Sequence, residues 1–225
     1  MKILIINPNS DPEMTEAIQR TAERFAGGEF EVVCLSTPGA PPFIETYEDE
    51  VKAAKGMFEL VRENEDEFDA FVIACHDDPN LDALKEITIK PVVGIGEASM
   101  KIASMLGHQF SVIQTTEHSI PLKESLVRKY HLQDVLASIR APRGGTRQQS
   151  DLEKYSEAAR AAIEEDRAEV IVLGCAGMTG LDKQIQKELG VPVLDGVICG
   201  LTIARGLVKH GVSTSKVRKF NPDSK

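Results

Sequence analysis

Two of the four cysteines stand at matching places in the sequence, and both could carry proton chemistry. Cys75 directly follows the apolar segment 70–74, and Cys175 follows the apolar segment 169–173 after one glycine. In each case a turn and a helix are expected next, so unpaired backbone amides near the sulfur would favour a thiolate. A thiolate can remove a proton and a thiol can supply one. Free cysteines are often core residues, but two at matched strand ends favour a base and an acid.

The remaining cysteines indicate packing. Cys34 lies inside an apolar segment and Cys199 lies in an apolar helical stretch, so both are interpreted as core residues. The apolar start of the chain ends by Asn7, too soon for the apolar region of a signal peptide, which indicates a cytoplasmic protein with reduced thiols. The sequence has no CxxC pair and its five histidines are scattered, so no metal site is expected.

Polar residues follow two further apolar segments. Asn7, Asn9 and Ser10 come after residues 2–6, and their amides and hydroxyl could hold a carbonyl or a ring amide of a ligand. In the second half, the segment 114–117 (QTTE) has the corresponding place. Its two threonines, Thr115 and Thr116, could bind polar ligand atoms. Turn formation and helix capping explain the same residues without a ligand, so both interpretations stay open.

The residues beside the two cysteines extend this candidate site. Ala176 and Gly177 follow Cys175, and such small residues let backbone amides approach a ligand. His76 follows Cys75, but neighbours along a strand point to opposite faces, so a reactive Cys/His pair is only weakly indicated. His76 is therefore assigned to the substrate-binding side of the site.

Two glycine-containing segments could in principle bind other ligands, but neither is assigned one. Gly94 and Gly96 lack the rest of a dinucleotide-binding fingerprint, which disfavours a nicotinamide cofactor. Residues 143–150 (RGGTRQQS) could bind an anion, but a solvated surface loop explains them better.

Short apolar segments that alternate with longer amphipathic ones must position these residues. The segments that predict strands are residues 2–6, 31–35, 70–74, 91–95, 110–114, 135–140, 169–173 and 191–194. The segments that predict helices are residues 14–25, 48–64, 81–86, 121–130, 152–165, 182–189 and 197–210. Near-continuous apolar strands separated by helices indicate parallel sheets covered on both faces, and therefore an α/β fold.

The two halves of the chain repeat this order of elements. Residues 68–75 resemble residues 167–175, because each segment has an acidic approach, an apolar strand and a cysteine. Residues 90–95 likewise resemble residues 190–195. A duplicated α/β unit explains both matches.

Duplication predicts two pseudo-symmetric parallel-sheet lobes. We expect residues 1–97 and 197–225 to form the first α/β lobe and residues 98–196 the second, with a short linker near residues 98–108. Open α/β folds bind ligands at the carboxyl ends of their strands, so the active site is expected in the crevice between the lobes.

Composition narrows the class of protein. The chain has 225 residues, of which 42% are hydrophobic, so it can bury a substantial core. Its 26 basic and 35 acidic residues give a formal charge of -9, which opposes binding to nucleic acids and to anionic membranes. The expected partner is a small-molecule substrate. Apolar faces such as that of residues 197–208 also suggest a homo-oligomer.

Taken together, these motifs resemble the hydantoin racemase group of the aspartate/glutamate racemase superfamily over nearly the whole chain. The matching segments are residues 7–10 with 14–15, 75–79 with 81–82, 115–116, 172–178, 191–197 and 213–216. The resemblance implies two α/β lobes with the active site between them and no cofactor. It implies that Cys75 and Cys175 are catalytic and that Asn7, Thr115 and Thr116 bind the ligand.

The resemblance also implies a two-base racemase that inverts the carbon next to a carbonyl in 5-substituted hydantoins. Allantoin racemases share much of the pattern and remain an alternative. In many relatives an aromatic or small residue follows the first cysteine, whereas His76 does here, which bears on the substrate side group. The pattern also leaves open an amino-acid racemase or a maleate isomerase of the same superfamily, and a two-lobed ligand-binding protein without catalysis.

Overall fold

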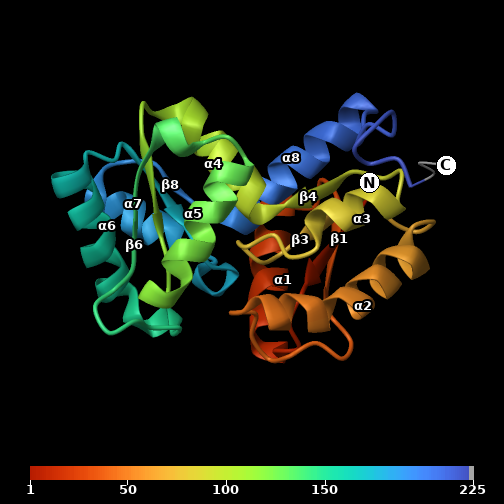
Figure 1. The fold of residues 1–225 in the computed structure, drawn as a ribbon, viewed down its shortest axis with the longest axis horizontal. Helices are drawn as coiled ribbons and strands as arrows, with labels where there is room; N and C mark the ends of the chain where they lie inside the picture. The colour runs from red at the N-terminus through yellow and green to blue at the C-terminus, as the bar shows by residue number, and fades with distance from the viewer. Residues whose placement is uncertain (223–225) are drawn as a thin grey trace. The chain divides into compact units, whose positions relative to one another are not determined.

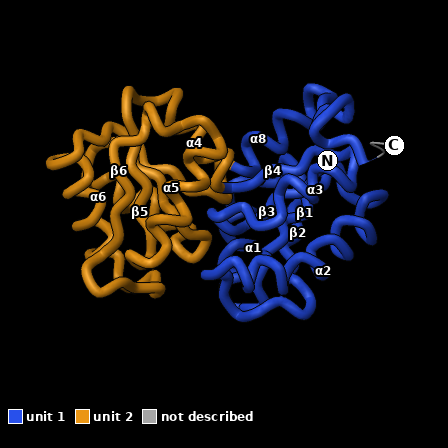
Figure 2. The backbone as a smooth tube through the Cα atoms, in the orientation of Figure 1, with its two compact units in different colours: residues 1–95, 200–225 blue, residues 96–199 orange. Residues whose placement is uncertain are grey.

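The chain forms two compact units, as the computed structural model shows for residues 1–222. The first unit holds Met1–Ile95 and the segment from Gly200 onward, and the second holds Gly96–Cys199 (Figure 2). Each unit contains one four-stranded parallel sheet with helices beside it (Figure 1). The predicted α/β class is therefore confirmed.

The first unit is built on a sheet with the strand order β2-β1-β3-β4. Its strands are β1 (Lys2–Asn7), β2 (Glu31–Ser36), β3 (Ala70–Ile73) and β4 (Val92–Gly94). Its helices are α1 (Pro12–Ala26), α2 (Tyr47–Asn64) and α3 (Leu81–Ile87), together with most of α8 (Gly196–His210). Asp11 accepts hydrogen bonds from two backbone amides of α1, and a Thr46–Asp49 capping box begins α2.

Alternate side chains of the first sheet face different helices. Leu4 and Ile6 of β1, with Phe71 and Ile73 of β3, form a core with α2 and α3. Val72, which lies between Phe71 and Ile73, faces α8. Its Cγ1 atom is so close to Gly200 of that helix that a methyl group on the glycine would lie 2.9 Å from it. The central strands are therefore buried on both faces, as their continuous apolar sequences predict.

The second unit repeats this plan with the strand order β6-β5-β7-β8. Its strands are β5 (Phe110–Ile113), β6 (Leu136–Arg140), β7 (Val170–Leu173) and β8 (Val193–Leu194). Its α-helices are α4 (Ile95–Leu106), α5 (Ile120–Lys129), α6 (Leu152–Asp166) and α7 (Asp182–Leu189). Four 3-10 turns lie between these elements, η1 (Glu117–Ser119), η2 (Gln133–Val135), η3 (Gln149–Asp151) and η4 (Ala176–Met178).

The second sheet is also covered on both faces. Ile113, Ile171 and Leu173 pack with α6 and α7, whereas Phe110 and Val172 pack with α4 and α5. Two separate cores result, one on each side of the sheet.

Two details of the sequence prediction are wrong. Residues 98–108 are not a linker, because α4 covers most of them and buries Ala98, Met100 and Ala103. Residues 90–95 correspond in the structure to residues 191–196 and not to residues 190–195. Phe71 N donates to the Pro91 carbonyl and Ile171 N to the Pro192 carbonyl, each at 2.9 Å, so the two prolines are equivalent.

Within the first unit, the segment after α8 contacts α3. Lys216 Nζ donates hydrogen bonds to the carbonyl oxygens of Lys85 and Glu86, at the C-terminal end of α3. A cation at this end of a helix satisfies carbonyl groups that have no partner within the helix. Lys216 therefore caps the C-terminal end of α3.

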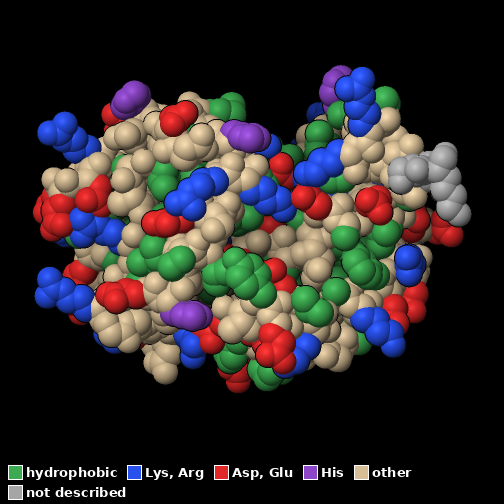
Figure 3. Space-filling model, in the orientation of Figure 1, with side chains coloured by type: hydrophobic (Ala, Val, Ile, Leu, Met, Phe, Trp, Pro, Cys, Tyr) green, Lys and Arg blue, Asp and Glu red, His purple; other side chains and the backbone are tan. Residues whose placement is uncertain are grey.

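The surface carries charges of both signs. Lys and Arg side chains lie among Asp and Glu side chains on the face in view in Figure 3. No helix within residues 1–222 is both long and apolar enough to span a membrane.

Candidate active site

In each unit, a cysteine follows the third strand at the carboxyl end of the sheet. Ala74 N donates to the Ile6 carbonyl at 2.8 Å, and Gly174 N donates to the Ile113 carbonyl at 2.8 Å. These bonds place Cys75 beside the end of β1 and Cys175 beside the end of β5. Ligands of parallel α/β sheets bind at this end of the strands.

The turns after the two cysteines have the same hydrogen-bond pattern. Asp78 N donates to the Cys75 carbonyl at 3.0 Å, and Met178 N donates to the Cys175 carbonyl at 3.1 Å. Asn80 in the first unit (φ 58°) and Gly180 in the second (φ 85°) are both left-handed, and the first turn has a further left-handed residue, Asp78 (φ 50°). The two cysteines are thus structurally equivalent, and both are partly exposed.

A backbone amide lies at the sulfur of Cys175. Gly177 N donates to Cys175 Sγ at 3.3 Å, across the turn η4. An amide in this position stabilises a thiolate, as the small residues after the cysteine predict. Ala176 is buried in the same turn, and Gly177 is half-buried.

The turn after β1 is closed by its own side chains. Asn7 Nδ2 donates to Asn9 Oδ1 at 2.7 Å and to Thr15 Oγ1 at 3.0 Å, so both of its amide hydrogens are used. Asn9 Nδ2 lies 3.2 Å from the Met14 sulfur. Asn7 and Asn9 are buried, whereas Ser10 is exposed. The asparagines therefore hold the turn beside Cys75 in one shape.

The loop after β6 lies against the end of β5. Thr146 N donates to the Thr115 carbonyl at 2.8 Å. Gly145 has a φ of 68°, and a methyl group on it would lie 3.1 Å from Thr116 Cγ2. Thr115 and Thr116 are both half-buried. Most of this loop is exposed, as the sequence predicts, but Gly145 and Thr146 approach Thr115 and Thr116 closely enough to make it part of the candidate site.

The same loop also reaches the turn after β7. Gln149 Nε2 donates to the Thr179 carbonyl at 2.8 Å, and Tyr155 Oη donates to the Thr146 carbonyl at 3.1 Å. Burial, and to a lesser degree the nearby Cys175 thiol, raises the pKa of the Tyr155 hydroxyl. Sequence reasoning missed Tyr155, and it considered Gln149 only as part of the loop 143–150, because the partner Thr179 lies 30 residues further along the chain.

A buried carboxylate fixes the end of the Cys175 turn. Asp195 Oδ2 accepts hydrogen bonds from Thr179 Oγ1 at 2.7 Å and Gly180 N at 2.8 Å, and Oδ1 accepts one from Val197 N at 2.8 Å. Burial raises the pKa of the Asp195 carboxyl, and these hydrogen bonds oppose that rise.

The first unit also has a carboxylate in this place, but it comes from the turn after β3 and not from the end of the last strand. Gly94 is equivalent to Asp195, since Pro91 and Pro192 are equivalent. A methyl group on Gly94 would lie 2.2 Å from Asp78 Oδ1. The Asp78 carboxylate therefore occupies the space above β4, and in the second unit a carboxylate rises from the end of β8.

The remaining thiols and histidines behave as packing or surface groups. Cys34 and Cys199 are buried, and burial raises the pKa of each thiol to about 12. The exposed histidines are His108, His118, His131 and His210. His76 is buried, with 1% of its surface exposed. No cluster of His, Cys, Asp or Glu within residues 1–222 is arranged to hold a metal ion.

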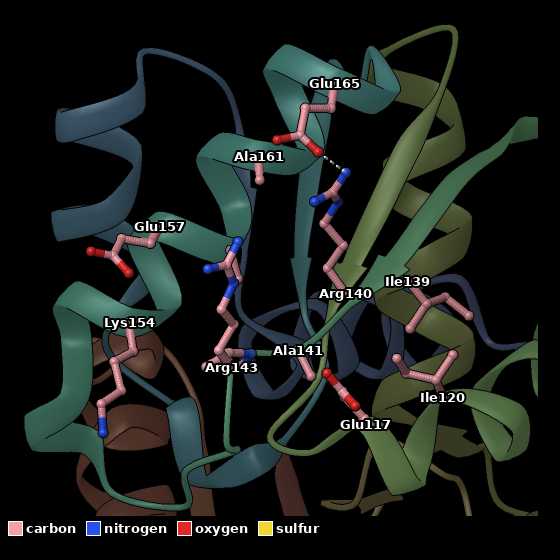
Figure 4. Close-up of a pocket in the computed structure, with 12 residues that line it drawn as sticks. Glu117, Ile120, Ile139, Arg140, Ala141, Arg143, Lys154, Glu157, Ala161 and Glu165 are labelled. Carbon is pink, nitrogen blue, oxygen red and sulfur yellow. Dashed lines mark hydrogen bonds and ion pairs between the residues drawn. The ribbon is translucent and has the colours of Figure 1, made fainter.

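A cavity of about 810 Å³ opens elsewhere in the second unit, between β6, α6 and the loop after β6 (Figure 4). Arg140 on its wall donates to Glu165 at 2.7 Å and to Asp166 at 2.5 Å. The Arg140 guanidinium lowers the pKa of the Asp166 carboxyl. Neither Cys175 nor Thr115 is among its lining residues, so the cavity is separate from the candidate active-site groups.

Within each unit, the fold brings the predicted groups to the carboxyl ends of the sheet strands. Cys75 and His76 adjoin the Asn7 turn, and Cys175 adjoins the turn that holds Thr115. Partly exposed strand-end thiols have the chemistry needed to exchange protons with a small molecule.

Comparison with known proteins identifies the family. The family model for Asp/Glu/Hydantoin racemase matches residues 3–204. A hydantoin racemase of Pseudomonas sp. (strain NS671) is 40% identical, with 100% of this chain and 93% of that protein covered. The structure of an allantoin racemase from Pseudomonas fluorescens is 37% identical with a TM-score of 0.94, covering 100% of this chain and 98% of that one.

The structure of an allantoin racemase from Klebsiella pneumoniae is also similar, at 35% identity and a TM-score of 0.92. It covers 100% of this chain and 95% of its own. The chain belongs to the Asp/Glu/Hydantoin racemase family, and it is an isomerase of the racemase type.

Proposed function

We propose that this racemase inverts the carbon next to a carbonyl in 5-substituted hydantoins or allantoin, without a cofactor, with Cys75 and Cys175 as its two proton-transfer groups. The observation that carries the proposal is the structural equivalence of the two cysteines. Both are partly exposed at a strand end, whereas Cys34 and Cys199 are buried. The names of the hydantoin and allantoin racemases that resemble the chain supply the substrate class.

The chemistry needs one base and one acid. A thiolate removes the proton from C5 of the ring, and the electron pair moves to the adjacent C4 carbonyl oxygen to form an enolate. The other thiol then gives a proton to the opposite side of C5, and the carbonyl re-forms. The two cysteines exchange roles for the opposite enantiomer. An unperturbed thiol pKa of about 8.5 makes both forms available near neutral pH.

The enolate oxygen requires hydrogen-bond donors placed in advance. Thr115, Thr116 and the backbone amides of Ala176 and Gly177 are the groups that we assign to this task and to ring binding. Asn7 uses both amide hydrogens within its turn, so we assign it, together with Asn9, to shaping the site beside Cys75. Ser10 is proposed to contact the part of the substrate that varies, and His76, which is buried next to Cys75, to support that part of the substrate-binding site.

The proposal is tested by the decay of optical rotation of single-enantiomer 5-benzylhydantoin, 5-methylhydantoin and allantoin. Wild-type protein under reductant should racemise at least one of them. Cys75→Ser and Cys175→Ser should each abolish racemisation. Cys34→Ala removes a buried thiol and should leave it unchanged, which makes it the matched control.

Deuterium uptake separates the two cysteines. In D2O, a variant that keeps one cysteine can still exchange the C5 proton of one enantiomer on one side of the ring, and the two variants should prefer opposite enantiomers. Normal racemisation by both single variants would show that the two-base mechanism is wrong. No racemisation of any of the three compounds by the wild type would exclude this substrate class.

A further inference from the structure

The residue that follows β5, Gln114, carries a buried amide group that the fold leaves incompletely bonded. Its backbone N donates to the Arg140 carbonyl at 2.7 Å, which fixes its position at the end of the sheet. Only 2% of the residue is exposed. Its Oε1 lies 3.2 Å from Ser119 Oγ, whose single hydrogen it shares with the Thr116 carbonyl at 2.8 Å. Its Nε2 has no hydrogen-bond partner among the described residues.

The first unit contains a direct comparison. Asn7 follows Ile6 as Gln114 follows Ile113, and the two isoleucine carbonyls accept equivalent bonds from Ala74 and Gly174. Both positions therefore carry a side-chain amide at a strand end beside a cysteine turn. The hydrogens of the Asn7 amide are donated to Asn9 and Thr15, whereas Nε2 of Gln114 donates to nothing in the described chain.

The neighbouring glycine makes room for the longer side chain. A methyl group on Gly174 would lie 3.0 Å from Gln114 Cδ and 2.7 Å from the Ile113 carbonyl oxygen. The equivalent residue in the first unit, Ala74, has that methyl group and stands beside the shorter asparagine. The Gln114 amide thus lies next to the residue that directly precedes Cys175.

A buried donor without a partner costs stability, so most such groups in folded proteins are satisfied by protein, water or ligand. The position beside Cys175 is one that a ligand would reach if that thiol exchanges protons with it. A cyclic imide or ureide presents carbonyl oxygens in the ring plane, and the oxygen next to the reacting carbon gains negative charge. An amide N–H is a suitable donor to that oxygen.

We infer that Gln114 Nε2 is a substrate-binding donor that hydrogen bonds to the carbonyl oxygen next to the reacting carbon. The inference rests on the proposed function for the identity of the ring, and it adds Gln114 to the groups assigned there. In this role Gln114 stabilises the enolate in the second unit, while Asn7 in the first unit shapes the site.

The test uses 5,5-dimethylhydantoin, which lacks a C5 proton and cannot turn over. The side-chain 1H–15N resonances of Gln114, assigned by their loss in Gln114→Leu, should move downfield when the wild-type protein is saturated with this probe. Gln114→Leu should bind the probe at least about tenfold more weakly and lower kcat for a racemisable hydantoin about a hundredfold. Gln133→Leu changes an exposed glutamine in the same unit and should alter neither quantity.

Thermal unfolding separates ligand binding from a structural role. Leucine removes a buried donor that has no partner in the described part of the chain, so Gln114→Leu should melt at the wild-type temperature or above it. A lower melting temperature that accounts for the loss of binding would overturn the inference. So would wild-type binding and turnover in this variant.

The two proposals fail in different ways. Racemisation by the wild type, with unmoved Gln114 resonances and normal turnover by Gln114→Leu, would overturn the role of Gln114 and leave the racemase proposal intact. A shifted Gln114 resonance and probe binding without racemisation would do the reverse. A wild-type protein that neither binds the probe nor racemises hydantoins would overturn both.

Discussion

Removing the Asp195 carboxylate is expected to destabilise the second unit strongly. The side chain is 3% exposed and accepts three hydrogen bonds of 2.7 to 2.8 Å, from Thr179, Gly180 and Val197. Asp195→Ala leaves these donors buried without their acceptor. Each such loss costs about 1–3 kcal/mol, and partial relaxation reduces the sum, so the free energy of unfolding should fall by about 3–5 kcal/mol.

A double-mutant cycle isolates the bond to the hydroxyl. Thr179→Val removes one hydrogen bond to the Asp195 carboxylate and should cost about 1.5 kcal/mol in the wild-type background. In the Asp195→Ala background the partner is already absent, so the same change should cost almost nothing. Urea unfolding followed by far-ultraviolet circular dichroism gives the four free energies. Asp134→Ala, at an exposed aspartate of the same unit, should stay within about 0.5 kcal/mol of the wild type.

The reasoning would be refuted if Asp195→Ala unfolded like the Asp134→Ala control. It would also be refuted if Thr179→Val cost the same with and without the carboxylate. Because Thr179 and Gly180 end the turn that begins at Cys175, Asp195→Ala should also lower kcat under conditions in which it remains folded.

Three further outcomes follow from the packing and the charges. At pH 8 a pKa of about 12 leaves Cys34 and Cys199 with about one thiolate in ten thousand, so iodoacetamide should label them, by mass spectrometry, only after unfolding. Asp166→Asn should cost about 1 kcal/mol at pH 7 by urea unfolding. Arg140 lowers the folded-state pKa of Asp166, so this stability is present above the ordinary pKa of about 3.9 and is lost as pH falls through the folded value. The same difference in unfolding free energy between wild type and Asp166→Asn at pH 2 as at pH 7 would contradict this reasoning. Lys216→Met should cost about 1 kcal/mol and speed hydrogen exchange in α3, and unchanged exchange would argue against the cap.

The sequence by itself determined the elements with a strong local pattern. Continuous apolar segments such as residues 170–173 are strands, because a parallel strand covered on both faces needs apolar side chains on both. The repeated order of elements and the cysteine after the third strand of each repeat were equally visible. Helix α4 was missed because its small residues, Gly96, Ala98 and Ser99, hide the helical period in the sequence.

Only the tertiary structure decided which polar groups are used up within the fold. Asn7 and Gln114 have the same amide chemistry and equivalent strand-end places, yet the Asn7 amide donates both hydrogens and Gln114 Nε2 has no partner within residues 1–222. Thr179 and Asp195 meet although they are 16 residues apart in sequence. Such outcomes depend on the side chains that distant segments bring to the same point, and local patterns do not encode those distances.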